Sequence, residues 1–280
     1  MILGLVGRNI GASLSPAIHH YSAACLGLKA VEYRLFSLAQ REQLEKFIHE
    51  FWLQGGWGLN ITSPYKSPVA RLLDVESEAV NVLFRGADAW QGASSDGEGF
   101  ARGLSYLGRP LSSYRDIVVL GFGGAVVSLL EYFIAHPWEN LASLRILCRP
   151  GSPQREAWVR RFAPRLPLFL HDFNPARLSL ALAEADADTL LIQGSSAPLE
   201  GDPLASFVPA LRDFKGTLSD LVYGYPSALL SAAEKQGILS QDGLPMLVEQ
   251  ARLAQELWWG QSLAGVDILR YLRTRGGGKR

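Results

Sequence analysis

The sequence carries no net charge and has few cysteines. Its 280 residues include 27 basic and 27 acidic side chains, so the formal net charge is zero. A nucleic acid or an anionic membrane normally requires a basic surplus that neutralises phosphates. The balance therefore argues against both partner classes and favours a small neutral or modestly anionic ligand. Cys25 and Cys148 form no metal-ligand or redox spacing, so we expect reduced, structural thiols and no metal site.

Long apolar runs are also missing. No stretch reaches the roughly 18 apolar residues that a membrane span requires. The first nine residues, MILGLVGRN, lack the basic leader of a signal peptide. These features predict a cytoplasmic protein. We interpret the end of the chain, RGGGKR at 275–280, as a flexible basic tail without a role in the fold.

Short apolar runs alternate with helical patterns in the first third of the chain. Apolar runs lie at 2–7, 31–38 and 56–62, and helix-compatible segments lie at 15–28 and 41–54. Ser15 and Pro16 have the pattern of an N-cap and a first helical residue, since proline there has no amide to lose. Such alternation predicts parallel strands joined by crossover helices.

A second series of the same kind follows a turn-rich stretch at 106–116. Its apolar runs lie at 116–120, 144–149, 168–172, 188–194 and 216–223, and helical patterns at 226–237, 245–260 and 263–275 close the chain. The series predicts a doubly wound sheet of its own. The last two helices have apolar spacing that suits packing against another surface, and we expect them to return to the first domain.

A glycine-rich loop opens the second series. Gly121, Gly123 and Gly124 come directly after the apolar run VVL and directly before a helical pattern. Glycines in this context let a backbone approach a diphosphate at a helix N-terminus. Val126 stands at the third glycine position of the G-x-G-x-x-G pattern, and Phe122 adds bulk, so both are expected to crowd the loop. The alternative is a tight strand-to-helix turn that simply requires glycine.

Arg149 ends the second strand of this series, where an acidic residue would bind the ribose of NAD. A guanidinium suits a 2′-phosphate because it donates two parallel charge-assisted hydrogen bonds. The sequence therefore favours NADP over NAD, with NAD as the other possibility. The competing interpretation is a solvent-exposed arginine at a strand end.

Polar residues cluster at the end of the run 56–62. Asn60, Thr62 and Lys66 lie between this strand and the next helix, the usual place of ligand groups in open parallel sheets. Asn81 and Asp96 lie further on. By themselves Asn81 and Asp96 have the pattern of turn and capping residues.

These residues resemble the motifs of the shikimate dehydrogenase family. The matching segments appear in the family's order and span nearly the whole chain: SLSP at 13–16, LNITSPYK at 59–66, AVN at 79–81, SSDGEGF at 94–100, VLGFGGA at 119–125, SDLVY at 219–223 and DGLPMLVEQA at 242–251. The resemblance implies an α/β protein of two domains. An N-terminal α/β substrate domain would span 1–100 and 238–280, and a Rossmann-like, NADP-binding domain would span 101–237.

The resemblance also implies an activity, a reversible NADP- or NAD-linked oxidation of a ring hydroxyl in the shikimate pathway of aromatic amino acid biosynthesis. By analogy Lys66 exchanges the proton of the reacting hydroxyl and Asp96 is its partner. Ser13 and Ser15 match residues that hold the substrate carboxylate, and Tyr223 lies near it. Ring hydroxyls would be bound by Asn60, Thr62, Asn81 and Gln250, and the cofactor by Gly121, Gly123, Gly124, Ala125, Arg149 and Ser195. We expect a monomer or homodimer.

Most departures from the family pattern fall on the cofactor side. Cys148-Arg149-Pro150 replaces Asn-Arg-Thr, and Gln193-Gly194-Ser195-Ser196 replaces Asn-Ala-Thr-Ser; on the substrate side, Ser94-Ser95 replaces Asn-Thr. Three alternatives stay open. The chain acts on quinate or aminoshikimate, or it binds shikimate-like ligands with weak or no turnover, or it is an unrelated two-domain dehydrogenase.

Some conspicuous side chains have an ordinary interpretation. His19 and His20 lie in an early helical pattern, with no third residue at metal-ligand spacing. We expect both to be partly exposed. Trp57, Trp258 and Trp259 are expected to pack in the core or at a domain surface.

Overall fold

The computed structural model describes residues 1–77, 79–151 and 153–276 and divides into two compact units. The first unit comprises Met1–Gly99 and the chain from Leu247 onward, and the second comprises Phe100–Met246. Within the described ranges, no helix combines the length and apolar character needed to cross a bilayer. Of the predicted tail at 275–280, Arg275 and Gly276 belong to the last helix, α10 (Gly265–Gly276), contrary to the prediction, and residues 277–280 lie outside the described residues.

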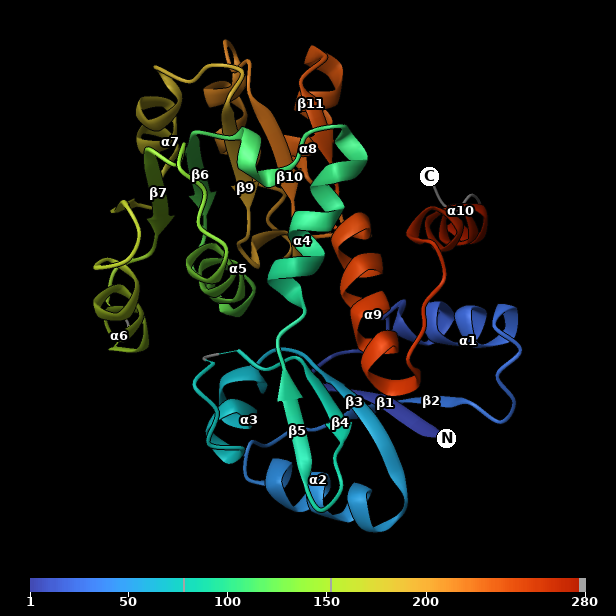
Figure 1. Ribbon diagram of the computed structural model, residues 1–280. Coiled ribbons are helices and arrows are strands. Elements are labelled where there is room, and N and C mark those ends of the chain that lie inside the picture. The colour runs from blue at the N-terminus through green and yellow to red at the C-terminus, as the bar shows by residue number, and fades with distance from the viewer. Residues whose placement is uncertain (78, 152, 277–280) are drawn as a thin grey trace. The chain divides into compact units, whose positions relative to one another are not determined.

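The first unit is built on a five-stranded mixed sheet in the order β2-β1-β3-β4-β5 (Figure 1). Its strands are β1 (Ile2–Gly7), β2 (Glu32–Ser37), β3 (Gly56–Ile61), β4 (Val82–Arg85) and β5 (Trp90–Ala93). β1 pairs in parallel with β2 and β3, whereas β3, β4 and β5 pair antiparallel. The carboxyl ends of β1 and β3 therefore lie at one edge, because parallel strands run in the same direction.

Helices cover both faces of this sheet (Figure 1). One core holds side chains of α2 (Gln43–Leu53) and α3 (Lys66–Leu72) against β1 and β3. On the other face, α9 (Leu244–Trp259) packs with β1, β2 and β4, and His19 of α1 (Ser15–Cys25) stacks on Tyr33 of β2. α10 (Gly265–Gly276) packs against α1, where the Tyr21 and Tyr271 rings stack at 3.9 Å. The predicted return of the C-terminal helices to the first domain is confirmed.

The second unit holds a six-stranded parallel sheet in the order β11-β10-β9-β6-β7-β8. Its strands are β6 (Asp116–Leu120), β7 (Ser143–Cys148), β8 (Leu168–Asp172), β9 (Thr189–Gln193), β10 (Thr217–Asp220) and β11 (Leu239–Gln241). The chain reverses its direction across the sheet between β6 and β9. That switch point is where doubly wound sheets hold ligands.

The helices of this unit flank the sheet on both sides (Figure 1). α5 (Gly124–Ala135) and α6 (Pro153–Phe162) connect β6, β7 and β8 in turn, while α7 (Pro175–Leu182) and α8 (Ala228–Gln236) share the core on the opposite face. α4 (Asp96–Leu104) links the units. Short 3₁₀ turns complete the chain: η1 (Ser105–Leu107), η2 (Leu111–Ser113), η3 (Ala197–Glu200) and η4 (Ala205–Leu211).

The α/β class with a doubly wound second sheet is confirmed, and three details differ from the prediction. The sequence analysis did not foresee the antiparallel strands β4 and β5 or the edge strand β11. Leu14 rather than Ser15 is the N-cap of α1, because the Ser13 hydroxyl accepts the Ser15 amide at 3.2 Å. The functional domains 1–100 with 238–280 and 101–237 stay a prediction, and the pairing of β11 with β10 favours a later second boundary.

Candidate active site

The chemical centre of the first unit is an ion pair between Lys66 and Asp96. Lys66 is the first residue of α3, shortly after β3, and its Nζ donates to Asp96 Oδ2. Asp96 lies in the first turn of α4, where the helix dipole favours a negative charge. The two side chains are only 11% and 9% exposed, so water screens their attraction weakly. An amine and a carboxylate are thus held together in a largely dry place.

Asn81 holds the carboxylate of this pair from the other side. Its Nδ2 donates to Asp96 Oδ1 at 2.8 Å and to Ser95 Oγ at 2.9 Å. Its Oδ1 accepts the Ser95 amide at 2.7 Å. Both ends of the Asn81 amide are therefore used, and Asp96 has one orientation. Ser95, which we noted only as a departure from the family pattern, supplies this support.

Gln250 of α9 approaches the same cluster. Its Oε1 lies 3.5 Å from Asn81 Nδ2, and its Nε2 donates to Leu247 O at 2.9 Å. Gly99 permits the approach, because a Cβ at Gly99 would lie 2.7 Å from the Gln250 amide nitrogen. Any larger residue at position 99 would push α9 away. The predicted residues Lys66, Asp96, Asn81 and Gln250 thus form one connected group.

Asn60 adds a further amide to the group. It is 4% exposed, its Nδ2 lies 3.5 Å from Asn81 O, and its Oδ1 accepts from the Tyr33 hydroxyl at 2.7 Å. Tyr33 lies in β2, far from the polar motifs in sequence. Only its presence in a strand next to β1 could have suggested that it reaches this edge of the sheet.

The remaining predicted residues of the first unit lie around the same edge of the sheet. Thr62 follows β3, and its methyl group would meet a Cβ placed on Gly7, the last residue of β1, at 2.4 Å. Ser13 and Ser15 follow β1, and Ser13 Oγ donates to Ser15 Oγ at 3.1 Å. These two hydroxyls form their own pair. Tyr223 follows β10 in the second unit.

The glycine-rich loop of the second unit joins two neighbouring strand ends. Gly121 follows β6 with φ +98°, and a Cβ there would lie 2.7 Å from the Ser195 amide nitrogen. Position 121 therefore requires glycine, both for its positive φ and for the close approach of the loop after β9. Gly123 caps α5 without a side-chain hydrogen bond, and a Cβ added there would meet no atom of the described chain within 4 Å. The amides of Gly124 and Ala125 at the start of α5 are thus approachable.

The expected crowding of this loop by Val126 and Phe122 is wrong. Val126 is fully buried and points at Gly194, where a Cβ would lie 2.6 Å from Val126 Cγ2. Phe122 packs on Trp158 of α6 with ring centroids 5.4 Å apart. Because a smaller residue at 194 accommodates the larger one at 126, two departures from the family pattern compensate each other.

Gln193 organises the strand end beside the loop. Its Oε1 accepts from both the amide and the hydroxyl of Ser195 at 2.7 Å, and its Nε2 donates to Asp220 Oδ1 at 3.2 Å. Asp220 is fully buried. Burial, together with the nearby Asp242, raises the pKa of its carboxyl group, although hydrogen bonds from Ser227, Val222 and Gln193 act in the opposite direction. Ser195 is thereby held against Gly121.

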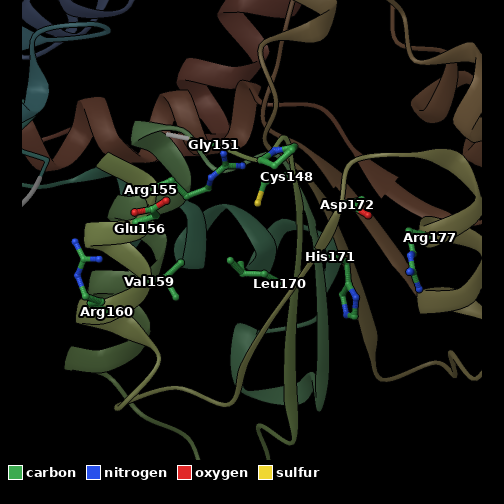
Figure 2. A pocket seen from close by; sticks show the side chains of 11 residues that line it. Cys148, Gly151, Arg155, Glu156, Val159, Arg160, Leu170, His171, Asp172 and Arg177 are labelled. Carbon is green, nitrogen blue, oxygen red and sulfur yellow. The ribbon is translucent and has the colours of Figure 1, made fainter. Parts of the chain in front are cut away.

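A cavity of about 540 Å³ opens beside the end of β7 (Figure 2). It is lined by Cys148, Pro150, Gly151, Arg155, Glu156, Val159, Arg160, Leu170, His171, Asp172 and Arg177. Among the described residues, the guanidinium groups of Arg155, Arg160 and Arg177 form no ion pair with a carboxylate. Arg149 is exposed and lies over the Phe173 ring at 5.9 Å, and it does not line the cavity. Sequence reasoning missed Arg155 and Arg177.

These features fit a phosphorylated dinucleotide. The start of α5 has no side-chain cap and offers amides to a diphosphate, and the arginines that line the cavity beside β7 suit a further phosphate. Gly121 and Gly123 carry no side chain, and Phe122 between them packs on Trp158.

Two histidines of α1 differ in exposure. His19 is fully buried rather than partly exposed as expected, since it lies between Tyr33 and Trp258, whereas His20 is exposed.

Comparison with known proteins relates this chain to one family. The family model of the shikimate dehydrogenase substrate binding domain matches residues 5–83. The NADP(+) shikimate dehydrogenase of Bacillus licheniformis is 30% identical over 273 residues, covering 92% of this chain and 91% of that protein. Its counterpart in Acinetobacter baylyi is 29% identical over 271 residues, covering 95% and 98%.

A solved structure shows the same fold over the whole chain. Shikimate 5-dehydrogenase from Thermus thermophilus, in complex with NADP(H) and shikimate, superimposes with a TM-score of 0.78 at 26% identity and covers 98% of this chain and 99% of that one. Sequence identity over more than nine tenths of both chains, on the same two-domain framework, decides the assignment. The chain belongs to the shikimate dehydrogenase family.

Proposed function

We propose that this chain catalyses the reversible, NADP-dependent oxidation of shikimate to 3-dehydroshikimate. The observation that carries the proposal is the Lys66–Asp96–Asn81 arrangement, which places an amine and a fixed carboxylate in a largely dry site of the family's substrate-binding domain. Relatives that span almost the whole chain are shikimate dehydrogenases that use NADP. The protein is therefore an oxidoreductase of the shikimate pathway.

Lys66 performs the proton transfer. NADP, when bound, accepts the two electrons and the hydrogen that leave the alcohol carbon. In the reduction direction the Lys66 ammonium group donates a proton to the carbonyl oxygen, and in the oxidation direction the amine left by loss of that proton accepts the hydroxyl proton as the carbonyl forms. Asp96 accepts a hydrogen bond from Nζ and holds it in one place, while Asn81 prevents the carboxylate from rotating. Such fixed geometry is what makes the transfer efficient.

The polar residues around this pair bind the substrate. Ser13 and Ser15 supply hydroxyl donors for its carboxylate, which avoids the desolvation cost of a buried cation. Asn60, Thr62, Asn81 and Gln250 bind ring hydroxyls, and Tyr223 contributes near the carboxylate. Because a ligand that lacks one hydroxyl would leave these groups unpaired, the site selects strongly for a polyhydroxylated ring acid.

The cofactor residues lie in the second unit. Gly121, Gly123, Gly124 and Ala125 provide the diphosphate cradle, and Ser195 borders it. Arg149 and the cavity residues Arg155 and Arg177 supply the positive charge for the 2′-phosphate. The chain offers arginine rather than a carboxylate directly after β7, and this favours NADP over NAD. We propose that the protein acts in the cytoplasm as a monomer or homodimer, without a nucleic-acid or membrane partner, which its zero net charge supports.

Steady-state assays test the proposal directly. Shikimate and quinate are each offered with NADP and with NAD, and reduced nicotinamide is followed by absorbance. We expect the highest kcat/KM with shikimate and NADP. Turnover with quinate alone would transfer the proposal to a quinate dehydrogenase, and no turnover with any pair would reject it. Calorimetry then distinguishes an enzyme from a pure binding protein, because the binding protein would bind shikimate but neither nucleotide.

A further inference from the structure

Two buried polar side chains lie at neighbouring strand ends beside the glycine-rich loop. Gln193 is the last residue of β9, Asp220 is the last residue of β10, and both are fully buried. Ser195 comes shortly after Gln193 and is partly exposed. A Cβ on Gly121 would lie 2.7 Å from the Ser195 amide nitrogen and 2.9 Å from Ser195 Cβ. Ser195 therefore borders the glycine-rich loop, and Gln193 contacts it from the buried side.

The contacts of Gln193 fix the orientation of its amide group. Its Oε1 lies 2.7 Å from the Ser195 backbone nitrogen, which only donates, so the amide oxygen is on that side. Its Nε2 donates to Asp220 Oδ1 at 3.2 Å and to Ser195 O at 3.3 Å. Asp220 Oδ1 also accepts the Val222 amide at 2.9 Å, so this oxygen is an acceptor. The reverse orientation would place donors against donors and acceptors against acceptors, which a fully buried amide does not tolerate.

This orientation leaves Ser195 with acceptors only. Its hydroxyl donates to Gln193 Oε1 at 2.7 Å, and its backbone NH donates to the same oxygen. A hydroxyl has one proton, so both polar protons of Ser195 are directed toward Gln193. The lone pairs of Ser195 Oγ stay available to a ligand. A phosphate oxygen that only accepts finds no donor on this residue, whereas a ligand hydroxyl finds an acceptor.

The strand order indicates which hydroxyl of a dinucleotide suits this acceptor. β6, which precedes the glycine-rich loop, lies between β9 and β7 in the sheet. The arginines assigned to the 2′-phosphate line the cavity beside β7, whereas Ser195 follows β9 on the other side. In NADP the ribose with the 2′-phosphate and the ribose with the nicotinamide are attached to opposite ends of the diphosphate. The β9 side therefore suits the ribose that carries the nicotinamide.

We propose that Gln193, anchored by Asp220, is a positioning residue that makes Ser195 a hydrogen-bond acceptor for a hydroxyl of the nicotinamide ribose. Gln193 is fully buried, so it acts through Ser195 and not on the ligand itself. The ligand part of this inference rests on the proposed function, whereas the orientation of the Gln193 amide does not.

The amide orientation is measured without any ligand. Hydrogen exchange of the full chain, followed by NMR, reports on the Ser195 backbone NH, whose acceptor is the Gln193 side chain. We expect Gln193→Met, which keeps the length of the side chain but carries no amide, to accelerate this exchange about tenfold. The Gly194 NH, which donates to Leu120 O at 2.8 Å, is the internal control and should exchange as in wild type. Unchanged exchange at Ser195, or equal acceleration at Gly194, would overturn the arrangement whether or not the chain is a dehydrogenase.

The effect on the ligand is measured by calorimetry with NADP and with adenosine 2′,5′-bisphosphate, the part of NADP that lacks the nicotinamide ribose. We expect Gln193→Met and Ser195→Ala each to raise the Kd of NADP about tenfold and to leave the Kd of the bisphosphate unchanged. Ser195→Thr keeps the hydroxyl and should retain the affinity for NADP. Gln236→Met, at an exposed glutamine of α8, should change neither Kd. In the Ser195→Ala background, Gln193→Met should weaken NADP binding little further, because both changes remove the same acceptor.

The outcomes separate the two proposals. If the wild-type chain binds neither NADP nor the bisphosphate, the proposed cofactor fails and the ligand part of this inference fails with it, while hydrogen exchange alone decides whether Gln193 holds Ser195. Wild-type binding with an unchanged Kd of NADP in Gln193→Met would refute the positioning role. An equal loss for NADP and the bisphosphate would refute it as well, since the damage would then lie outside the nicotinamide half of the ligand.

Discussion

Val126 occupies the space that the absence of a side chain at Gly194 leaves open. A Cβ on Gly194 would lie 2.6 Å from Val126 Cγ2, well inside van der Waals contact, and Val126 is fully buried. Val126 lies in the first turn of α5, which follows β6, and Gly194 comes directly after β9. β6 and β9 are the neighbouring strands between which the switch point lies. The pair therefore sets how closely the start of α5 and the loop after β9 approach each other.

Substitution of this pair tests the packing. We expect Gly194→Ala to lower the free energy of unfolding by about 1–3 kcal/mol through overpacking. Addition of Val126→Ala should recover part of that loss, because the smaller side chain removes the clash. Urea unfolding of the two single variants and the double variant measures the interaction. Gly11→Ala, at an exposed glycine where a Cβ would meet nothing, is the control. Strictly additive losses would contradict a direct contact.

The arginines of the cavity beside β7 should distinguish the two nicotinamide cofactors. We expect Arg155→Ala and Arg177→Ala each to raise the Kd of NADP about tenfold or more, because a charge-assisted hydrogen bond contributes about 1.5–3 kcal/mol. The Kd of NAD should change little, since NAD lacks the third phosphate. Arg165→Ala, an exposed arginine outside the cavity, is the charge-matched control. Equal losses for both cofactors would place the phosphate elsewhere.

Stability should fall in acid because His19 is buried in its neutral form. Its pKa is about 3 in the folded chain against 6.5 for the free side chain. The unfolded chain binds the extra proton first, so the contribution is complete above pH 6.5 and is lost as the pH falls toward 3. The slope is about 1.4 kcal/mol per pH unit. Urea unfolding of wild type and His19→Phe across this range should give a flatter profile for the variant, and parallel profiles would contradict the burial of a neutral imidazole.

Titration of Asp220 should change the free energy of unfolding with pH in the opposite direction. Burial raises its pKa above the ordinary value of 3.8, so the folded chain holds the proton longer than the unfolded chain. Its contribution to stability is therefore complete below pH 3.8 and decreases as the pH rises through the folded pKa. Asp220→Asn keeps an acceptor for Val222 and Gln193 but does not titrate. The difference in unfolding free energy between variant and wild type should grow with pH, and a constant difference would contradict the raised pKa.

Much of the first unit's site was predictable because its residues follow strand ends in short motifs. Lys66 and Asn60 flank the end of β3, and the family order of motifs added Asp96, Asn81 and Gln250. Tyr33 was not, because it reaches Asn60 through the pairing of β2 with β1 rather than through a local pattern. The burial of His19 was not predictable either, because it depends on Trp258 and Gln255 of α9, more than 200 residues away in sequence.

The cofactor side was harder to predict for a similar reason. Val126 looked obstructive beside the glycines, and only its distance to Gly194 shows that it points into the core. Arg149 stood where the motif places a phosphate ligand, yet the cavity is lined by arginines of α6 and α7. The β4–β5 hairpin was missed because its strands have four residues each and its turn lacks an Asn-Gly or Asp-Gly signal.

The central claim is that Lys66 transfers the proton of the reacting hydroxyl while Asp96 holds its amine. The most direct measurement compares kcat for shikimate oxidation in wild type and in Lys66→Ala, with circular dichroism and shikimate affinity as checks on folding and binding. We predict a loss of about 10²–10⁴-fold in kcat, the usual contribution of a general base, with the ligand still bound. Near-normal kcat in a folded Lys66→Ala protein would contradict the account.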